Sequence, residues 1–97
     1  MPFWVYVLRC SDGSYYTGHT DDLPLRIGKH QTGEISGYTA SRLPVELVFS
    51  QECHTRVEAL AAESQIKGWS RAKKEALFLR DWKKLNRLSR GKDRSQR

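Results

Sequence analysis

The sequence predicts an α+β fold, a small three-stranded antiparallel sheet flanked by helices in the order β-β-α-β-α-α. Three observations favour this class. Two β-rich segments flank an Asp-Gly turn, a third β-rich segment follows a helical stretch, and two further helical stretches complete the chain. The 97 residues suffice for one small domain with a modest core.

The first two elements form a predicted hairpin. Phe3–Cys10 is a nearly unbroken apolar run, as expected for a strand buried on both faces. Ser14–Thr20 follows the turn and is its expected partner. Tyr6 and Tyr16 are ten residues apart and have equal parity, so a tight hairpin brings both phenols to one face of the sheet.

The next segment predicts a helix. Asp21 or Asp22 can cap its N-terminus, and Pro24 is compatible with the first turn. The helix is expected to run to about Thr32, because Gly33 can end it there. Residues 34–44 are then expected to form a loop.

A third strand is predicted over Val45–Ser50. Thr55 and Glu58 have the spacing of a capping box, which begins a second helix that ends at about Lys67. Ser70 begins a third helix, expected to reach about Leu88. The prediction is therefore one domain over residues 1–88 and a basic, disordered tail over residues 89–97.

The charge of the chain is divided unevenly. Residues 1–66 hold five Arg and Lys against eight Asp and Glu, a net charge of −3, whereas residues 67–97 hold twelve against three, a net charge of +9. A basic segment beside an acidic one indicates a polyanionic partner. The alternative is a solvated basic helix with a loose tail.

Other functional classes are disfavoured by what the sequence lacks. It has no apolar run long enough for a membrane span and no secretory signal, so no membrane partner and a cytoplasmic location are expected. Its two cysteines lack the CxxC spacing of a zinc site and are expected to be reduced thiols.

Arg26 and His30 are four residues apart and share a face of the first predicted helix. A guanidinium binds phosphate through a planar fork, and an imidazole can shuttle a proton near neutral pH. The alternative pairs Arg26 with Asp22 and leaves His30 at the surface.

Glu63 lies at the edge of the apolar face of the second predicted helix. Mg²⁺ prefers oxygen ligands and often takes one or two carboxylates together with a substrate phosphate. The alternative is an ion pair with Lys67, four residues on. Two tyrosines, Arg26, His30 and Glu63 form a plausible phosphodiesterase set, because phosphoryl chemistry needs positioning and charge neutralisation.

At this point the sequence resembles the GIY-YIG nuclease superfamily and, within it, the small single-domain bacterial proteins of the UPF0213 type. The matching segments are Trp4-Val5-Tyr6, Tyr16-Thr17-Gly18, Arg26 and His30 at the family spacing, Glu63 within Ala62–Lys67, Ile66–Lys74, and Gly37–Thr39 through Arg42–Val48. They cover roughly residues 3–80. The ordered set with its spacing is far more specific than either triplet alone.

The resemblance implies hydrolysis of a DNA phosphodiester bond by an activated water, with one divalent metal ion, Mg²⁺ or Mn²⁺. It makes Glu63 the metal ligand and Arg26 the phosphate-binding residue. Tyr6 or Tyr16 assists the water, and His30 orients a tyrosine or relays a proton. DNA repair or processing is the expected context, and RNA stays open as a substrate.

Three departures from the family pattern are visible. The first triplet lacks Gly-Ile, His19 stands where many members carry lysine, and Asn86 is too far downstream to match the asparagine that often supports the metal site. No separate DNA-binding domain like that of larger family members is expected, so the basic helical segment is the expected substitute. The predicted nucleic-acid contacts are His19, Arg71, Lys73, Lys74, Lys83 and Lys84.

Two other functions are compatible with the same sequence. A DNA-binding module on the same scaffold would bind without cutting. A protein-docking domain would use Trp69, Phe78 and Trp82, for which core packing of the last helix is the simpler account.

Overall fold

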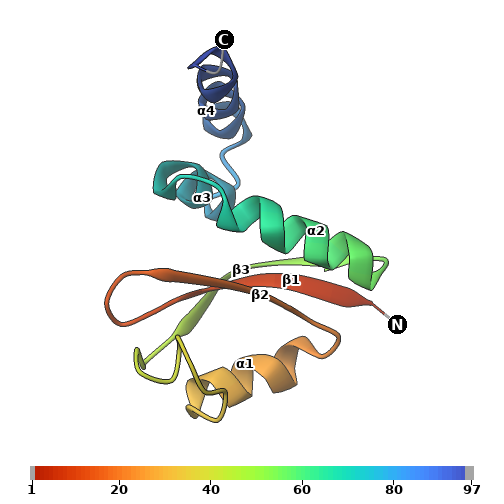
Figure 1. Cartoon of the computed structure of the whole chain (residues 1–97), viewed down its shortest axis with the longest axis vertical. Helices are drawn as coiled ribbons and strands as arrows, with labels where there is room; N and C mark the ends of the chain where they lie inside the picture. The colour runs from red at the N-terminus through yellow and green to blue at the C-terminus, as the bar shows by residue number, and fades with distance from the viewer. Residues whose placement is uncertain (1, 96–97) are drawn as a thin grey trace. The chain divides into compact units, whose positions relative to one another are not determined.

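The computed structural model describes residues 2–95, which contain three strands and four helices in the order β-β-α-β-α-α-α. The predicted α+β class and the antiparallel three-stranded sheet are confirmed, with one helix more than expected. The chain forms two compact units, residues 1–67 and 68–97. The first holds the sheet and two helices (Figure 1).

The sheet consists of β1 (Phe3–Arg9), β2 (Tyr15–Thr20) and β3 (Glu46–Cys53), in the spatial order β2-β1-β3 with antiparallel pairing throughout. Because β1 is central, its residues 5–8 are at most 1% exposed, which confirms the strand predicted to be buried on both faces. The third strand ends at Cys53, three residues beyond its predicted end.

The turn between β1 and β2 brings the two phenols together as predicted. Gly13 adopts a φ of 85°, a conformation that glycine allows without a steric penalty. In the resulting register Tyr6 is opposite Gly18, and Leu8 is opposite Tyr16. The two phenol rings therefore share one face of the sheet, with their centroids 6.4 Å apart.

Helices α1 (Leu23–Gln31) and α2 (Arg56–Lys67) lie on opposite sides of the sheet (Figure 1). Asp22 caps α1 as predicted, because its Oδ1 accepts a hydrogen bond of 3.2 Å from the Leu25 amide. Leu23 and Ile27 pack against the face of the sheet that carries the tyrosines.

The second unit corrects the prediction of one long helix from Ser70 to Leu88. It contains α3 (Arg71–Phe78) and α4 (Trp82–Ser95). Arg80 has a φ of 54°, and the amides of Arg80 and Asp81 bond to the carbonyls of Leu77 and Ala76, which is a Schellman ending. Arg80 takes the place that glycine usually occupies, so the sequence carried no stop signal there.

The carboxylate of Asp81 then begins α4 by accepting a 3.1 Å hydrogen bond from the Lys84 amide. Helix α4 continues to Ser95, so residues 89–95 are helical where a disordered tail was expected. The rest of that predicted tail, residues 96–97, lies outside the described residues. The side chain of Trp82 is 51% exposed, so core packing does not account for it.

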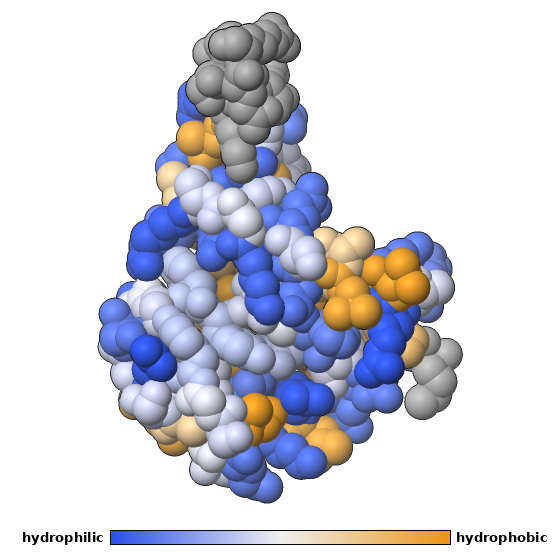
Figure 2. All heavy atoms as spheres, viewed as in Figure 1, coloured by the Kyte–Doolittle hydropathy of each residue, from blue (hydrophilic) through white to orange (hydrophobic). Residues whose placement is uncertain are grey.

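The face of the molecule seen in Figure 2 is mainly hydrophilic, with apolar side chains gathered over α2. Val57 and Leu60 are exposed apolar residues of that helix. No helix in the described part of the chain has the length and apolar character needed to cross a membrane.

Candidate active site

A cleft of about 210 Å³ opens at the β2 edge of the sheet. Its lining residues are Tyr6, Tyr16, Gly18, His19, Thr20, Asp21, Arg26, Arg56 and Glu63. Because β2 is an edge strand, side chains from both faces of the sheet can reach the cleft. Of the five predicted catalytic residues, the structure brings four to this cleft. The fifth, His30, lies behind Tyr6 and contacts it directly.

Gly18 makes this arrangement possible. A Cβ atom at this position would lie 2.6 Å from the Tyr6 hydroxyl oxygen and 2.8 Å from its Cζ. Both distances are far below van der Waals contact. The phenol of Tyr6 can therefore occupy its position only because residue 18 has no side chain. The glycine of the second triplet therefore has a packing reason to be there.

Tyr6 ends a buried chain of hydrogen bonds. Its hydroxyl shares a 2.8 Å bond with His30 Nε2, and His30 Nδ1 shares a 2.8 Å bond with the Thr39 hydroxyl. Each of these three residues is at most 2% exposed. The alternative in which His30 is a surface residue is therefore wrong. The imidazole is held between two hydroxyls, and in its neutral form it accepts a hydrogen bond from one of them and donates to the other.

Burial governs the protonation of this chain. It raises the pKa of Tyr6 well above the ordinary value, with the neighbouring Tyr16 adding to the rise and Arg26 opposing it. Burial also lowers the pKa of His30, and the positive charge of Arg26 lowers it further. In the resting protein Tyr6 is thus a neutral phenol and His30 a neutral imidazole.

The buried imidazole predicts a pH dependence of stability. Because the folded pKa of His30 lies below its ordinary value of 6.5, the unfolded chain takes up a proton near that pH that the folded protein does not. The free energy of unfolding should therefore fall as the pH drops through 6.5 toward the folded pKa of His30. One proton contributes a slope of at most about 1.4 kcal/mol per pH unit.

Urea unfolding of wild type and His30→Gln at about ten pH values between 5 and 8 measures the contribution of His30 to the pH dependence of the free energy of unfolding. The wild-type curve should be steeper than that of the variant. His54→Gln removes an exposed imidazole and should keep the wild-type slope. Parallel curves for wild type and His30→Gln would contradict the assignment.

The ring of Tyr16 is positioned by contacts with neighbouring aromatic side chains. Its centroid lies 5.2 Å from that of His30 and 6.2 Å from that of Tyr38, with which it stacks at an interplanar angle of 26°. Tyr38 and Thr39 both belong to the loop between α1 and β3. Consecutive loop residues therefore support the two phenols, Tyr38 by contacting Tyr16 and Thr39 through His30.

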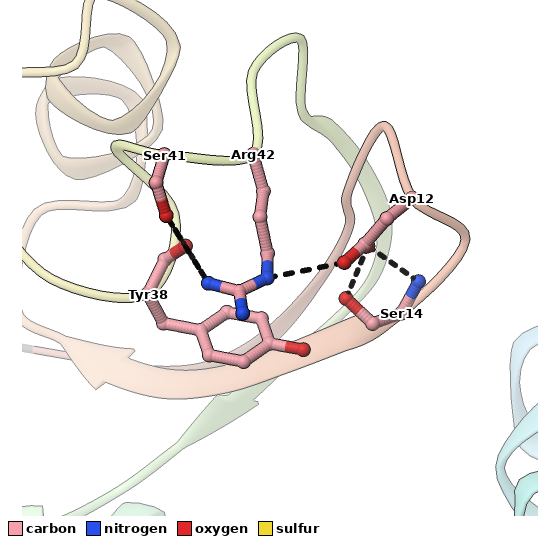
Figure 3. A network of polar contacts seen from close by, with 5 residues as sticks. All are labelled: Asp12, Ser14, Tyr38, Ser41 and Arg42. Carbon is pink, nitrogen blue, oxygen red and sulfur yellow. Dashed lines mark hydrogen bonds and ion pairs between the residues drawn. The ribbon is translucent and has the colours of Figure 1, made fainter.

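This loop is fastened to the β1–β2 turn (Figure 3). The Arg42 carbonyl accepts a 2.9 Å bond from the Ser11 amide, and Arg42 Nε donates a 3.1 Å bond to Asp12. Tyr38, Thr39 and Arg42 lie in segments that matched the family, but the sequence suggested no role for them. Helical and strand periodicity say nothing about the role of a loop residue. Only the residue types in this segment could have indicated that these three residues support the site.

Glu63 has two cationic or ionisable neighbours. Its Oε1 lies 2.7 Å from His19 Nδ1, and its Oε2 accepts a 2.7 Å hydrogen bond from Lys67 Nζ. Burial alone would raise the pKa of the carboxyl, but the bonds from Lys67 and His19 outweigh it and hold the pKa below its ordinary value. Glu63 is therefore an anion at neutral pH, and its predicted pairing with Lys67 coexists with its place in the cleft.

Arg26 and Arg56 add fixed positive charge to the cleft. The expected alternative pairing of Arg26 with Asp22 is not found among residues 2–95, where the Asp22 carboxylate instead caps α1. Arg56, the first residue of α2, was missed because its helical position did not distinguish it from an ordinary surface residue. The cleft thus combines two carboxylates, Asp21 and Glu63, and two phenols with arginines suited to a phosphate.

The predicted nucleic-acid contacts lie in both units. His19 is in the cleft, where it contacts Glu63. The others are in the second unit: Arg71, Lys73 and Lys74 on α3, and Lys83 and Lys84 on α4. Arg71 pairs with Glu75 at 3.0 Å, and Lys73 lies over the Trp69 ring.

Comparison with known proteins identifies the family. The GIY-YIG catalytic domain matches residues 2–76. A UPF0213 protein of Halobacterium salinarum is 47% identical over 74 residues, which are 76% of this chain and 96% of that protein. A UPF0213 protein of Streptococcus pneumoniae is 42% identical over 86 residues, 89% of this chain and 86% of that protein.

Solved structures agree with this assignment. The solution structure of a UPF0213 protein from Bacillus halodurans is 44% identical, with a TM-score of 0.52 over 79% of this chain and 82% of that one. A second solution structure, of a protein from E. faecalis, is 34% identical, with a TM-score of 0.54 over 79% of this chain and 83% of that one. The chain therefore belongs to the GIY-YIG catalytic domain family and is similar to its small UPF0213 members.

Proposed function

We propose that this protein is a metal-dependent endonuclease that hydrolyses DNA phosphodiester bonds, in DNA repair or processing. One observation carries the proposal. Tyr6, Tyr16, Arg26 and Glu63 come from four different elements, yet they line a single cleft. Family membership supports a nuclease-type function, and the phosphate-binding chemistry of the cleft supports a nucleic-acid substrate.

The donor set of the cleft fits Mg²⁺ or Mn²⁺. Within the described residues no cluster of three or more His, Cys, Asp or Glu side chains is arranged to hold a metal. Of the two carboxylates that line the cleft, Asp21 is exposed and Glu63 is largely buried, so we assign such an ion to Glu63, with waters and substrate phosphate oxygens supplying the other ligands. The bound ion would neutralise phosphate charge and favour deprotonation of a water. Lys67 or His19 would have to release a Glu63 oxygen to admit it.

The remaining roles follow from position and charge. Arg26 would bind the scissile phosphate, because its guanidinium is permanently charged and lies in the cleft. Tyr6 is buried and retains its proton, so it suits hydrogen-bond donation. Tyr16 is only half-buried and lines the same cleft, so we assign the attacking water to it. His30 would orient Tyr6 or relay its proton.

Cleavage of plasmid, nicked and branched DNA tests the proposed function. Wild-type protein should produce cut strands with Mg²⁺ or Mn²⁺, lose this activity in EDTA, and regain it when metal is restored. Running the same substrates as RNA defines the nucleic-acid class. The absence of metal-dependent product from every substrate would reject the nuclease proposal.

A DNA-binding module without cleavage is the second candidate, favoured by the basic side chains of α3 and α4. We expect the joint replacement of Lys73, Lys74, Lys83 and Lys84 by alanine to weaken DNA binding and flatten its salt dependence. Each lost phosphate contact should reduce the slope of log affinity against log salt by about 0.9.

Fluorescence anisotropy on a short duplex, from about 50 to 200 mM salt, measures this slope. Lys29→Ala, which removes an exposed lysine of α1, is the control for a general loss of charge. An unchanged slope in the fourfold variant would count against the basic residues as contacts. Binding by wild type without metal-dependent product would favour this second function over the first.

A further inference from the structure

The loop between α1 and β3 contains an arrangement that the proposed reaction does not yet use. Tyr38 is 41% exposed, and the Arg42 guanidinium carbon lies 3.8 Å from the centroid of its ring. The same guanidinium donates a 2.9 Å hydrogen bond to the Tyr38 carbonyl and a 3.1 Å bond to Asp12. An exposed aromatic side chain is thus fixed at both its ring and its backbone (Figure 3).

The ring of Tyr38 is connected to the cleft through Tyr16. Tyr38 stacks with Tyr16 at 6.2 Å, and Tyr16 lines the cleft beside Arg26. A row of contacts therefore runs from Asp12 in the hairpin turn through Arg42 and Tyr38 to Tyr16. The position of Tyr6 is defined by a buried hydrogen bond, whereas the ring of Tyr16 contacts three other rings, those of Tyr38, His30 and Tyr6.

The magnitudes indicate what this row can do. An exposed cation–π contact, a pair of aromatic rings and an exposed ion pair each contribute little to the free energy of unfolding. Its loss should therefore change global stability only modestly. A displacement of about 1 Å at a reacting group can, however, lower a rate about 100-fold. A positioning role thus predicts a loss of rate out of proportion to the loss of stability.

We propose that Tyr38 is a positioning residue that orients the phenol of Tyr16, and that Arg42 and Asp12 hold Tyr38 in place. The expected effect on the cleavage rate rests on the proposed nuclease function, but the orientation of Tyr16 does not. The orientation of Tyr16 can be measured separately.

The kinetic test compares Tyr38→Ala with Tyr38→Phe, which retains the ring. Tyr38→Ala should lower kcat for metal-dependent DNA cleavage about 10- to 100-fold with little change in KM. Tyr38→Phe should stay within about threefold of wild type. Arg42→Ala and Arg42→Lys should both lower kcat, because an ammonium lacks the planar fork that bonds Asp12 and covers the ring.

The orientation test uses fluorine NMR of protein labelled with 3-fluorotyrosine, with the Tyr16 signal assigned from Tyr16→Phe. The Tyr16 signal should broaden or split in Tyr38→Ala, because the phenol then samples more than one orientation, and keep its wild-type width in Tyr38→Phe. An unchanged signal in Tyr38→Ala overturns the positioning role whether or not the protein cuts DNA.

The two tests separate the inference from the function beneath it. If wild type cuts no DNA, the proposed function fails and the NMR signal still decides whether Tyr38 orients Tyr16. If cleavage is seen but Tyr38→Ala retains its kcat, the inference fails and the nuclease stands. A rise in KM at constant kcat for Arg42→Ala would make Arg42 a substrate contact and also overturn the inference.

Discussion

Glu63→Gln is expected to reduce metal-dependent DNA cleavage by about 10²- to 10³-fold. Stabilisation of phosphate charge by a bound metal ion is worth several kcal/mol, and Glu63 is the carboxylate through which the cleft would hold that ion. The amide is nearly isosteric and can still hydrogen-bond, but it lacks the negative charge. The measurement is single-turnover cleavage at saturating protein with Mg²⁺ and with Mn²⁺.

The control is Glu52→Gln, which removes an exposed carboxylate from β3 and should retain wild-type cleavage. Titration of Mn²⁺ followed by electron paramagnetic resonance adds a readout that does not depend on turnover. Metal affinity should fall in Glu63→Gln and persist in Glu52→Gln. If Glu63→Gln cuts DNA as fast as wild type, Glu63 does not hold a catalytic metal.

Gly18→Ala is expected to lower the free energy of unfolding by about 1–3 kcal/mol, as overpacking of a tight interior does. The new Cβ would lie 2.6 Å from the hydroxyl oxygen of Tyr6, which is 1% exposed and bonded to His30. The phenol must move, and its bond to the imidazole must lengthen or break. Urea unfolding measures the loss, and cleavage should decline with it because the displaced phenol belongs to the cleft.

Gly28→Ala is the matched control for this substitution. Gly28 lies within α1, and apart from its chain neighbours and the nearby backbone of that helix a Cβ there meets no atom within 4 Å. Alanine there should raise the free energy of unfolding by about 0.5–1 kcal/mol, because glycine weakens a helix interior. The same chemical change should thus have opposite effects at the two positions. A Gly18→Ala protein as stable as wild type would show that Tyr6 does not pack against this backbone.

Much of the fold could be predicted because its signals are local. The Asp-Gly turn and equal residue parity placed Tyr6 and Tyr16 on one face, and the register confirms it. The caps at Asp22 and Thr55 began their helices as expected. The break between α3 and α4 was not predicted, because Arg80 adopts a left-handed backbone conformation that is uncommon for arginine.

The three strands, the first two helices, the shared face of the two phenols and the residue types of a phosphate-binding site could all be predicted from the sequence. That Glu63, on the opposite side of the sheet from the phenols, lines their cleft at the β2 edge is visible only in three dimensions. The same is true of the support that Thr39 and Tyr38 give to His30 and Tyr16. Turns, caps and residue parity depend on near neighbours in the sequence, whereas the cleft depends on how β2, Gly18 and the loop between α1 and β3 come together in space.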